Sequence, residues 1–497
     1  MTIFGLSTES SNMVNTLTDL KLYLLTWNVV GRPPIEDLRE ALGLGEPVDV
    51  SHIPDFYGLA LQEVSCKPQD LLAEMIIEDP WVVAFRDILQ KWGYVKLKQI
   101  RLQGMSLYLF SKREHVTHIR GLQTSYTRTG LGGMWGNKGG VSIRFNAYGC
   151  SICLVNCHLA AHDSELQQRI DDYNSIIDHQ KFVDPQTENI ITHDYTFWFG
   201  DLNFRLDEFT AEEIVHLVEK KSFPQLLLKD QLRKVIKLGQ AFSEFTESPP
   251  TFPPTYKYNI GKSEYDISKR KPAWTDRVLF RFTPNAYENA TLSLKQLHYG
   301  CHANYEQSDH KPVTSSFLIK VFSQPKEKKV FFLPIKDWRV NSDSAAWYTF
   351  SEGAEPSTWD WIGLFRADYT STDEHVCYIW APVRPSSSMP VLPSDSCIPE
   401  EEQNDSQASS CLATSLRQHQ GPWYRVVFAD QTLLIPGRYR LFYISSEFDD
   451  ILGVSEPFEY IPSHGDVANG GGLFGDVPLL ASLAVVIFAM IMLLLRC

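Results

Sequence analysis

The first twenty residues of this 497-residue chain lack a charged stretch followed by an apolar run, so we expect no secretory signal. The chain also lacks a disulfide framework, since its nine cysteines are odd in number and irregularly spaced. Both absences predict a reducing, cytosolic setting. The close spacing of Cys150, Cys153, Cys157 and His158 leaves a zinc site as an alternative. The run that holds them is typical of a strand, whose successive side chains face opposite sides, and this disfavours zinc.

Positive charge is scarce as well, and the net charge of −14 argues against broad nucleic-acid binding. We therefore expect no nucleic-acid partner. The stretch from Tyr256 to Arg277 is an exception, with six basic residues against three acidic ones. This local surplus suits a small polyanionic ligand; the alternative is an ordinary solvated basic loop.

Long apolar runs are absent except for one, Val477 to Leu495, which has 19 residues without a charge. At about 1.5 Å per residue, such a helix nearly crosses a hydrocarbon core of about 30 Å. The run predicts a transmembrane tail anchor, joined by a flexible linker over 462–476, and the alternative is a buried core helix. Because a short span suits a thin bilayer, we expect the endoplasmic reticulum membrane, with the protein facing the cytosol. The cytosol and the plasma membrane are the alternatives.

The remaining chain divides into two regions of different pattern. Residues 18–322 alternate strand-like runs with helical ones such as 164–179 and 210–220, which predicts a layered α/β domain. After a polar linker at 323–329, residues 328–461 show short aromatic and β-branched runs without helical periodicity. This pattern predicts an all-β, immunoglobulin-like sandwich. Its stretch 384–421, rich in Pro, Ser, Glu and Gln, is expected to be a disordered loop.

Ionisable or metal-binding side chains lie at the edges of five apolar runs in the first region. Single polar residues of this kind are often only turn formers. Ligand sites in helix-covered sheets, however, lie at strand ends, so groups far apart in sequence can meet there. The residues concerned are Asn28, Glu63, His158 with His162, Asp201 with Asn203 and Arg205, and Asp309 with His310.

These residue types predict metal-assisted attack of water on a phosphoester. Glu63 and Asn28 offer the hard oxygen ligands that Mg²⁺ prefers. Asp201 is a candidate base for the water, and Asn203 could hold the water or a phosphate oxygen. The histidines could donate hydrogen bonds to phosphoryl oxygens, and either Asp276 or Asp309 could fix a histidine tautomer.

A series of motifs in the first region resembles that of the inositol polyphosphate 5-phosphatases, in the family's order. The motifs are TWNV, LQEV, GMWGNKGGVSIRF, NCHLAAH, WFGDLNFR, FPPTYKY, KPAWTDRVL and SDHKPV. The resemblance implies a four-layer DNase I-like α/β sandwich. In the second region, WDWIGLF and GRYRLFYIS resemble the SKICH domain.

The resemblance also implies roles for individual residues. Glu63 and Asn28 match the family's Mg²⁺ site, Asp201 and Asn203 the pair that handles the water, and His310 the catalytic histidine with Asp276 as its partner. Other positions match substrate contacts: His158, His162, Asn137, Lys138 and Arg205 near the scissile phosphate, and Tyr256 and Lys257 at the 4-phosphate. Lys269 stands for a family lysine in a segment that is shorter here.

The resemblance implies an Mg²⁺-dependent phosphatase that removes the 5-phosphate from phosphatidylinositol 4,5-bisphosphate and 3,4,5-trisphosphate, with soluble inositol polyphosphates as further candidates. Phosphoinositide lipids are the expected partners, and the SKICH-like domain could bind a protein. Two alternatives stay open. One is another phosphodiesterase of this fold, such as a nuclease or a sphingomyelinase. The other is a membrane-anchored adaptor with an inactive phosphatase domain.

Overall fold

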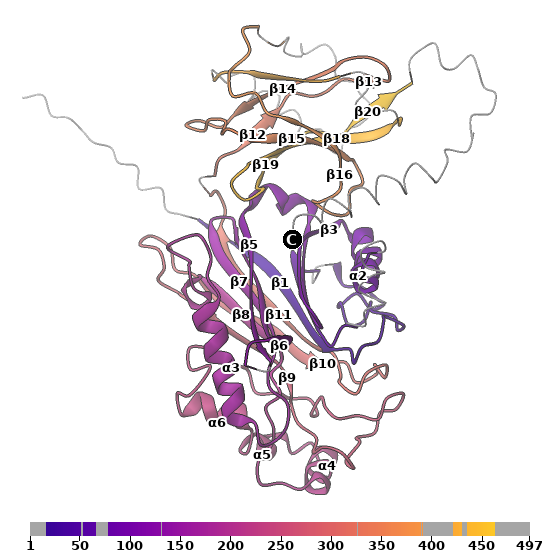
Figure 1. Cartoon of the computed structure of the whole chain (residues 1–497), viewed down its shortest axis with the longest axis vertical. Helices are drawn as coiled ribbons and strands as arrows, with labels where there is room; N and C mark the ends of the chain where they lie inside the picture. Colours follow the sequence, from indigo (N-terminus) through magenta and orange to yellow (C-terminus); the bar gives the residue numbers. More distant parts are fainter. Residues whose placement is uncertain are drawn as a thin grey trace, which may run out of the picture.

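A computed structural model describes residues 16–50, 53–65, 78–130, 132–325, 327–388, 390, 421–429 and 435–462. The described residues form an N-terminal α/β domain and a C-terminal β domain, with the latter at the top of Figure 1. The expected loop residues 391–420, the linker beyond 462 and the apolar run 477–495 lie outside this range. No helix within the described ranges has the length and apolar character needed to cross a bilayer.

Two sheets form the centre of the N-terminal domain. The first runs β10 (Leu294–Cys301), β11 (Val313–Phe322), β1 (Leu17–Asn28), β2 (Phe56–Gln62), β4 (Met105–Lys112) and β3 (Tyr94–Leu102). The second runs β5 (Ile119–Gly130), β6 (Trp135–Ala147), β7 (Cys150–His158), β8 (Tyr195–Asp201) and β9 (Asp276–Phe282). A large apolar core lies between their facing sides.

Helices cover the outer faces of these sheets and complete four layers (Figure 1). Helix α2 (Pro80–Leu89) packs on the first sheet, and α3 (Leu166–His179) and α6 (Gln231–Lys237) pack on the second. Helices α4 (Ala211–Glu219) and α5 (Phe223–Leu227) lie near α6, at the end away from the C-terminal domain. Short 3₁₀ turns are η2 (Gln90–Trp92), η3 (Arg113–His118) and η4 (Ile190–Thr192). The DNase I-like prediction is thereby confirmed.

Local sequence explains these elements. Strands β2, β7 and β8 are buried along their whole length, as expected for near-continuous apolar runs covered on both faces. The helices expected at 164–179 and 210–220 are observed as α3 and α4. A capping box formed by Thr210 and Glu213 marks the start of α4.

The C-terminal domain is an all-β sandwich, as predicted. One sheet runs β12 (Val330–Phe332), β14 (Ser344–Phe350) and β17 (Tyr424–Phe428). The other runs β13 (Trp338–Arg339), β20 (Phe458–Ile461), β18 (Gly437–Ile444), β15 (Trp361–Arg366) and β16 (His375–Trp380), and β19 (Ile451–Val454) pairs with β18. Aromatic and aliphatic side chains fill the space between the two sheets.

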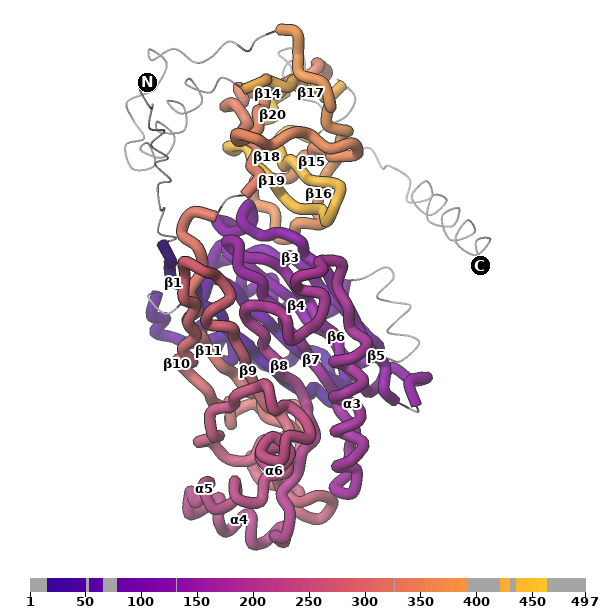
Figure 2. The backbone as a smooth tube through the Cα atoms, turned by 90° about the vertical axis from the view of Figure 1, so that its left-hand side faces the viewer, coloured from indigo at the N-terminus to yellow at the C-terminus, as the bar shows by residue number. Residues whose placement is uncertain are grey.

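The two domains share a packed interface (Figure 2). Phe365, Phe442 and Ile444 of the C-terminal domain belong to the same apolar cluster as the core of the N-terminal domain. The backbone of Lys96 donates to Thr370 at 2.9 Å and accepts from Thr372 at 3.1 Å, so this segment pairs with the free edge of β3. The linker and the loop at Asp450 add polar contacts, including a bond from the Gly121 N–H to Asp450 Oδ1 at 2.7 Å. Burial raises the pKa of Asp450 to about 6.

Candidate active site

Strand register brings the polar residues of separate strand ends together. Parallel pairing aligns Asn28 on β1 with Gln62 on β2, directly before Glu63. In the second sheet, Asp201 on β8 is flanked by His158 on β7 and Asp276 on β9. The start of β1 pairs with the end of β11, next to the linker into the C-terminal domain. The candidate site therefore lies at the opposite end of the N-terminal domain.

Asp201 is the centre of the site and is almost fully buried, with 1% of its surface exposed. Its Oδ2 accepts from Asn28 Nδ2 at 3.1 Å and lies 3.2 Å from His158 Nε2. Its Oδ1 accepts the Asn203 N–H at 3.1 Å. Three donors from three segments thus fix the carboxylate in one orientation, which a turn-forming aspartate would not need.

The environment keeps Asp201 ionised. Burial by itself raises its pKa, but the hydrogen bond from His158 and the positive charges of His310 and Lys138 outweigh burial and hold the pKa well below the usual carboxyl range. A carboxylate of such low pKa is a weak proton acceptor. Asp201 is therefore better suited to orient a water molecule than to remove its proton unaided.

His310 and Asp276 form a buried pair beside Asp201. His310 Nδ1 lies 2.9 Å from Asp276 Oδ2, and its Nε2 lies 4.0 Å from Asp201 Oδ2. Burial lowers the pKa of His310, but the charges of Asp276 and Asp201 prevail and raise it to about 9. Asp276 is itself held by the hydroxyls of Thr255 and Thr275, at 2.7 and 2.9 Å. The site thus presents an imidazolium at neutral pH.

Asp309, the other candidate partner for a histidine, faces elsewhere. Its Oδ2 accepts a hydrogen bond from Lys257 Nζ. Burial lowers the pKa of Lys257, but the bond and charge of Asp309 give a net rise. The ring of Tyr256 lies near both Lys257 and His310. Its centroid is 5.3 Å from Lys257 Nζ and 4.3 Å from the ring centroid of His310. The Arg205 guanidinium lies 4.9 Å over the same ring. Of the two candidate aspartates, Asp276 is the one that holds His310.

Glu63 and Asn28 lie together as the sequence predicts. Asn28 Nδ2 donates to Glu63 Oε1 and to Asp201 Oδ2, each at 3.1 Å, so both carboxylates share one donor. The side chain of Glu63 is 47% exposed, and its oxygens retain free lone pairs. The exposed carboxylate of Glu63, next to the buried carboxylate of Asp201, offers hard oxygen donors that fit a divalent cation. In this orientation the Asn28 oxygen accepts the Val30 N–H, so Asn28 orders the carboxylates and Glu63 is the exposed ligand.

Asp201, Asp276 and His310 also lie close enough together to hold a metal. The hydrogen bond between His310 and Asp276, and the positive charge on that histidine, make this group an ion pair instead. A bound cation there would repel the imidazolium. The Glu63 side of Asp201 is the more suitable place for a metal.

The remaining predicted substrate residues lie at different distances from this centre. Lys138 Nζ contacts His158 Nε2, and burial lowers the pKa of Lys138. Arg205 donates to Asn203. His162 faces Arg270, with Nδ1 and Nη2 2.8 Å apart, and does not contact Asp201.

Asn137 and Lys269 are not brought into contact with the central residues. Asn137 is exposed at the start of β6. Lys269 has a side chain that is 73% exposed, and its closest charged partner is Asp266 at 3.7 Å. The prediction that both contact substrate remains untested.

Three residues of the site region were missed by the sequence interpretation. Thr255 and Thr275 hold Asp276, and Arg270 faces His162. The threonines lie inside the FPPTYKY and KPAWTDRVL motifs, next to residues that were selected. Their position in these motifs could have indicated a role in the site. A threonine hydroxyl is uncharged, however, and its residue type alone does not predict a catalytic or binding function.

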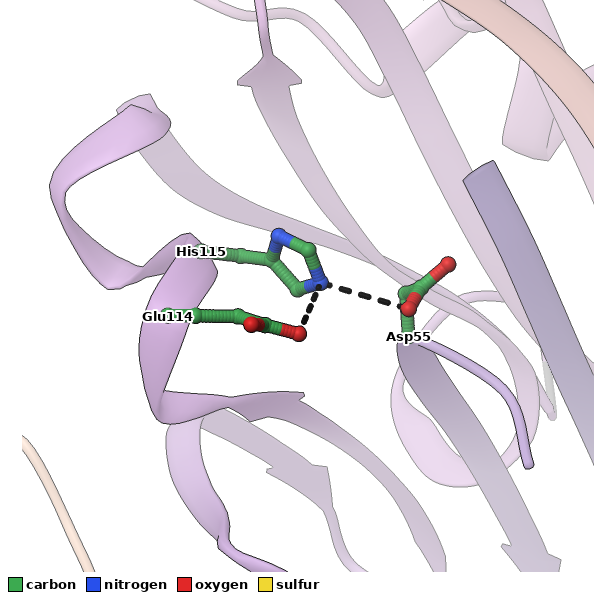
Figure 3. A group of neighbouring side chains, drawn as sticks. All are labelled: Asp55, Glu114 and His115. Carbon is green, nitrogen blue, oxygen red and sulfur yellow. Dashed lines mark ion pairs between the residues drawn. The ribbon is translucent and has the colours of Figure 1, made fainter. Parts of the chain in front are cut away.

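A second cluster of ionisable groups, Asp55, Glu114 and His115, could also hold a metal by spacing (Figure 3). His115 Nε2 lies 3.3 Å from Asp55 Oδ1 and 3.6 Å from Glu114 Oε1. The same Asp55 oxygen pairs with Lys112 Nζ at 2.9 Å, so its charge is already neutralised. The cluster precedes β2 and includes η3, at the end of the domain away from Asp201. These contacts join the segment before β2 to η3, whose Arg113 donates a hydrogen bond to the Tyr369 carbonyl of the C-terminal domain.

Two family profiles match the chain. The Endonuclease/Exonuclease/phosphatase family 2 matches residues 25–316, and the SKICH domain matches residues 330–460. Inositol polyphosphate 5-phosphatase K of Mus musculus is 36% identical over 376 residues, which cover 73% of this chain and 79% of that protein. The chain belongs to the inositol polyphosphate 5-phosphatase family. The motifs that suggested this family therefore identified it correctly.

Other members of the 5-phosphatase family support this assignment. Phosphatidylinositol 4,5-bisphosphate 5-phosphatase A of Rattus norvegicus is 34% identical over 449 residues, which cover 88% of this chain but only 42% of that protein. The chain thus spans about two fifths of that relative's length. The crystal structure of the inositol polyphosphate 5-phosphatase domain (IPP5C) of SPsynaptojanin in complex with inositol (1,4)-bisphosphate and calcium ion has a TM-score of 0.53 and 30% identity. The match covers 62% of this chain and 86% of that one.

Proposed function

We propose that the chain is a phosphatase that removes the 5-phosphate from phosphatidylinositol 4,5-bisphosphate and 3,4,5-trisphosphate, and from soluble inositol polyphosphates that carry the same phosphate. The observation that carries this proposal is the Asp201 centre, where His158, Asn28 and the His310–Asp276 pair converge. Relatives whose names state this activity support it. Because Asn28, His158, Asp276 and His310 are assembled around Asp201, an inactive adaptor is the weaker hypothesis.

In the proposed mechanism, Asp201 is ionised beforehand because of its low pKa and orients the attacking water. As the new O–P bond forms, the water becomes strongly acidic and its proton passes to Asp201. The bond from phosphorus to the inositol oxygen breaks, and that oxygen takes a proton from solvent. The His310 imidazolium donates to a phosphoryl oxygen as negative charge develops, while Asp276 holds the other ring nitrogen. Arg205 and Lys138 add positive charge near the scissile phosphate. A divalent cation on Glu63 would supply further charge neutralisation and would lower the pKa of water.

The experiment that tests the activity is phosphate release from a panel of inositol lipids and soluble inositol phosphates, with and without divalent metal. We expect release from substrates with a 5-phosphate and little release from matched substrates without it. Hydrolysis of abasic-site DNA or sphingomyelin, without release from inositol phosphates, would instead favour another phosphodiesterase of this fold.

The metal is proposed to be Mg²⁺, held on the exposed carboxylate of Glu63. We expect Glu63→Gln to raise the Mg²⁺ concentration needed for half-maximal activity by about tenfold or more, because it removes one charged ligand. Glu219→Gln, at an exposed position on α4, is the matched control. Activity should be titrated against Mg²⁺ for both variants, and Mg²⁺ affinity measured by calorimetry. Unchanged Mg²⁺ dependence in Glu63→Gln would remove Glu63 from the metal site.

Tyr256 and Lys257 are proposed to contact the 4-phosphate. We expect Lys257→Ala to lower kcat/KM about tenfold more on a 4,5-bisphosphorylated substrate than on one without the 4-phosphate, since a charge-assisted bond is worth roughly 1.5–3 kcal/mol. The substitution also leaves Asp309 unpaired, because these two side chains are bonded. The double variant Lys257→Ala/Asp309→Asn controls for this. Equal losses on both substrates would leave Lys257 only a general electrostatic role.

A membrane anchor over 477–495 and a location on the cytosolic face of the endoplasmic reticulum are proposed from the apolar run. Anchoring would raise the local concentration of lipid substrate. We expect removal of residues 477–497 to leave turnover of soluble inositol phosphates unchanged and to release the protein to the cytosol. Fractionation and imaging test this. A truncated protein that stays on the reticulum would assign targeting to the SKICH domain or a partner.

A further inference from the structure

The SKICH domain exposes a row of aromatic rings beside its outermost described strand. Trp359, Tyr378 and Trp380 are 68%, 52% and 52% exposed. The Trp380 ring lies 5.6 Å from Trp359 and 5.6 Å from Tyr378, and Tyr378 lies 5.6 Å from Trp361. We call these four residues the aromatic platform. A contiguous exposed patch of this kind marks an interaction site more often than scattered apolar residues do.

The backbone of β15 and β16 shapes the platform. Gly363 on β15 lies opposite Tyr378 on β16. A Cβ at Gly363 would come within 2.9 Å of the Trp361 ring and within 2.7 Å of the Phe365 ring. The missing side chain therefore lets the aromatic rings close over the strand. On β16 itself, the half-buried Cys377 and Ile379 face the core, whereas Val376, Tyr378 and Trp380 face outward.

Strand β16 also has an open edge. Within the described ranges it pairs only with β15, so alternate backbone N–H and C=O groups point away from the sheet without a strand partner. The same domain already closes a sheet edge in this way elsewhere. Thr370 and Thr372, directly before β16, bond to Lys96 at the free edge of β3.

The aromatic platform is continuous with an interface that already exists. Phe365, next along β15 on the same face as Trp361, stacks on Phe442 at 4.1 Å and packs in the core shared with the phosphatase domain. His375, at the start of β16, lies between the two surfaces, with its ring 6.2 Å from Phe365 and 5.4 Å from Trp361. The outer face of β15 and β16 is thus covered by the phosphatase domain at Phe365 and exposed at Tyr378 and Trp380.

We propose that the open edge of β16 binds an extended segment of a partner protein, which adds a strand to the sheet and lays apolar side chains on the aromatic platform. A polypeptide is favoured over a lipid surface because only a polypeptide would use the directional backbone groups of the edge. Alternate residues of the partner segment would face the platform, so its apolar residues should recur at every second position. The inference concerns binding and does not depend on the phosphatase activity.

The test begins with a displayed library of short linear peptides, selected on the full chain in mild detergent. Synthetic versions of the selected peptides are then titrated against variants. We expect alternating apolar residues in these peptides, and we expect Trp380→Ala and Val376→Lys each to weaken binding about tenfold or more, as for interface hot spots. Ile435→Lys, at another exposed apolar position of the domain, is the matched control and should bind as the wild type. Turnover of soluble inositol phosphates should be equal in all of them.

Hydrogen exchange supplies a second measurement that does not rely on substitutions in the protein. We expect the bound peptide to slow exchange at the β16 amides, and a proline in the middle of the peptide to abolish both binding and protection. Three results would overturn the proposal. One is peptide binding that Trp380→Ala leaves unchanged, or protection confined to other strands. Another is loss of binding to phosphatidylcholine vesicles in Trp380→Ala without any peptide binding. The third is dimerisation of the chain through β16, seen by light scattering and abolished by Val376→Lys.

Discussion

Asp201→Asn is expected to lower kcat by about 10²–10⁴-fold, the range that positioned acid–base groups contribute. The substitution keeps the shape of the side chain but removes the charge that holds His158 and that faces His310. The strongly lowered pKa of Asp201 means that its side chain carries a negative charge. Asn at this position therefore no longer orients the water in the same way and no longer balances the charges of two cationic groups. Substrate binding should be largely kept, so KM should change much less than kcat.

The measurement is steady-state turnover of a soluble inositol phosphate, with circular dichroism to confirm folding. Asp178→Asn, an exposed aspartate on α3, is the matched control and should have wild-type activity. A loss below about tenfold in Asp201→Asn would assign this residue a structural role at the end of β8. It would then be only one of the turn formers that are common at strand ends.

His310→Ala is expected to cause a loss of similar size, about 10²–10⁴-fold in kcat, because the imidazolium that donates to the phosphoryl group is removed. The losses of His310→Ala and Asp201→Asn should not add fully in the double variant, since both residues serve one transition state. Full additivity would mean that the two residues act in separate steps.

The pH profile tests the state of His310 independently. Its pKa is raised to about 9, so the positive charge is present below that pH and is lost as the pH rises through it. Activity of the wild type should therefore decline above about pH 9. Asp276→Asn removes the bonded carboxylate, so the decline should move toward the ordinary histidine value of about 6.5. A bound metal lowers the pKa of His310 in the wild type and in Asp276→Asn alike. The quantity to measure is therefore the difference between the two pH profiles. An unchanged profile in Asp276→Asn would exclude His310 as the titrating group.

The SKICH domain takes part in this molecule as a fixed neighbour of the phosphatase domain. Its apolar residues share a core with the first domain, and its Thr370–Thr372 segment closes the edge of β3. The candidate active site and the domain interface lie at opposite ends of the sheets, as the register of β1 with β11 and of β7 with β8 requires. A partner bound at β16 would thus leave the mouth of the active site free.

The sequence by itself determined the fold class and most of the site. Fully buried strands have continuous apolar runs, so β2, β7 and β8 could be predicted with their polar ends. The strands β13 and β19, with 2 and 4 residues, are too short for a sequence periodicity to predict them. The family motifs identified the residues around Asp201 because chemistry restricts the residue types that can stand there.

Only the tertiary structure decided which residue partners which. Asp309 is adjacent to His310 in the chain, yet its carboxylate bonds to Lys257. Asp276 is 34 positions away and lies beside His310 because the backbone at Tyr256 bridges both Ala273, just before β9, and His310. The exposure of the aromatic platform could not be predicted from the sequence either, since an aromatic strand predicts burial. The rings are exposed because β16 lies at the end of its sheet and no described element covers its outer face. Sequence pattern depends on local periodicity and residue chemistry, whereas partner choice depends on strand order and register, which are set by contacts distant in sequence.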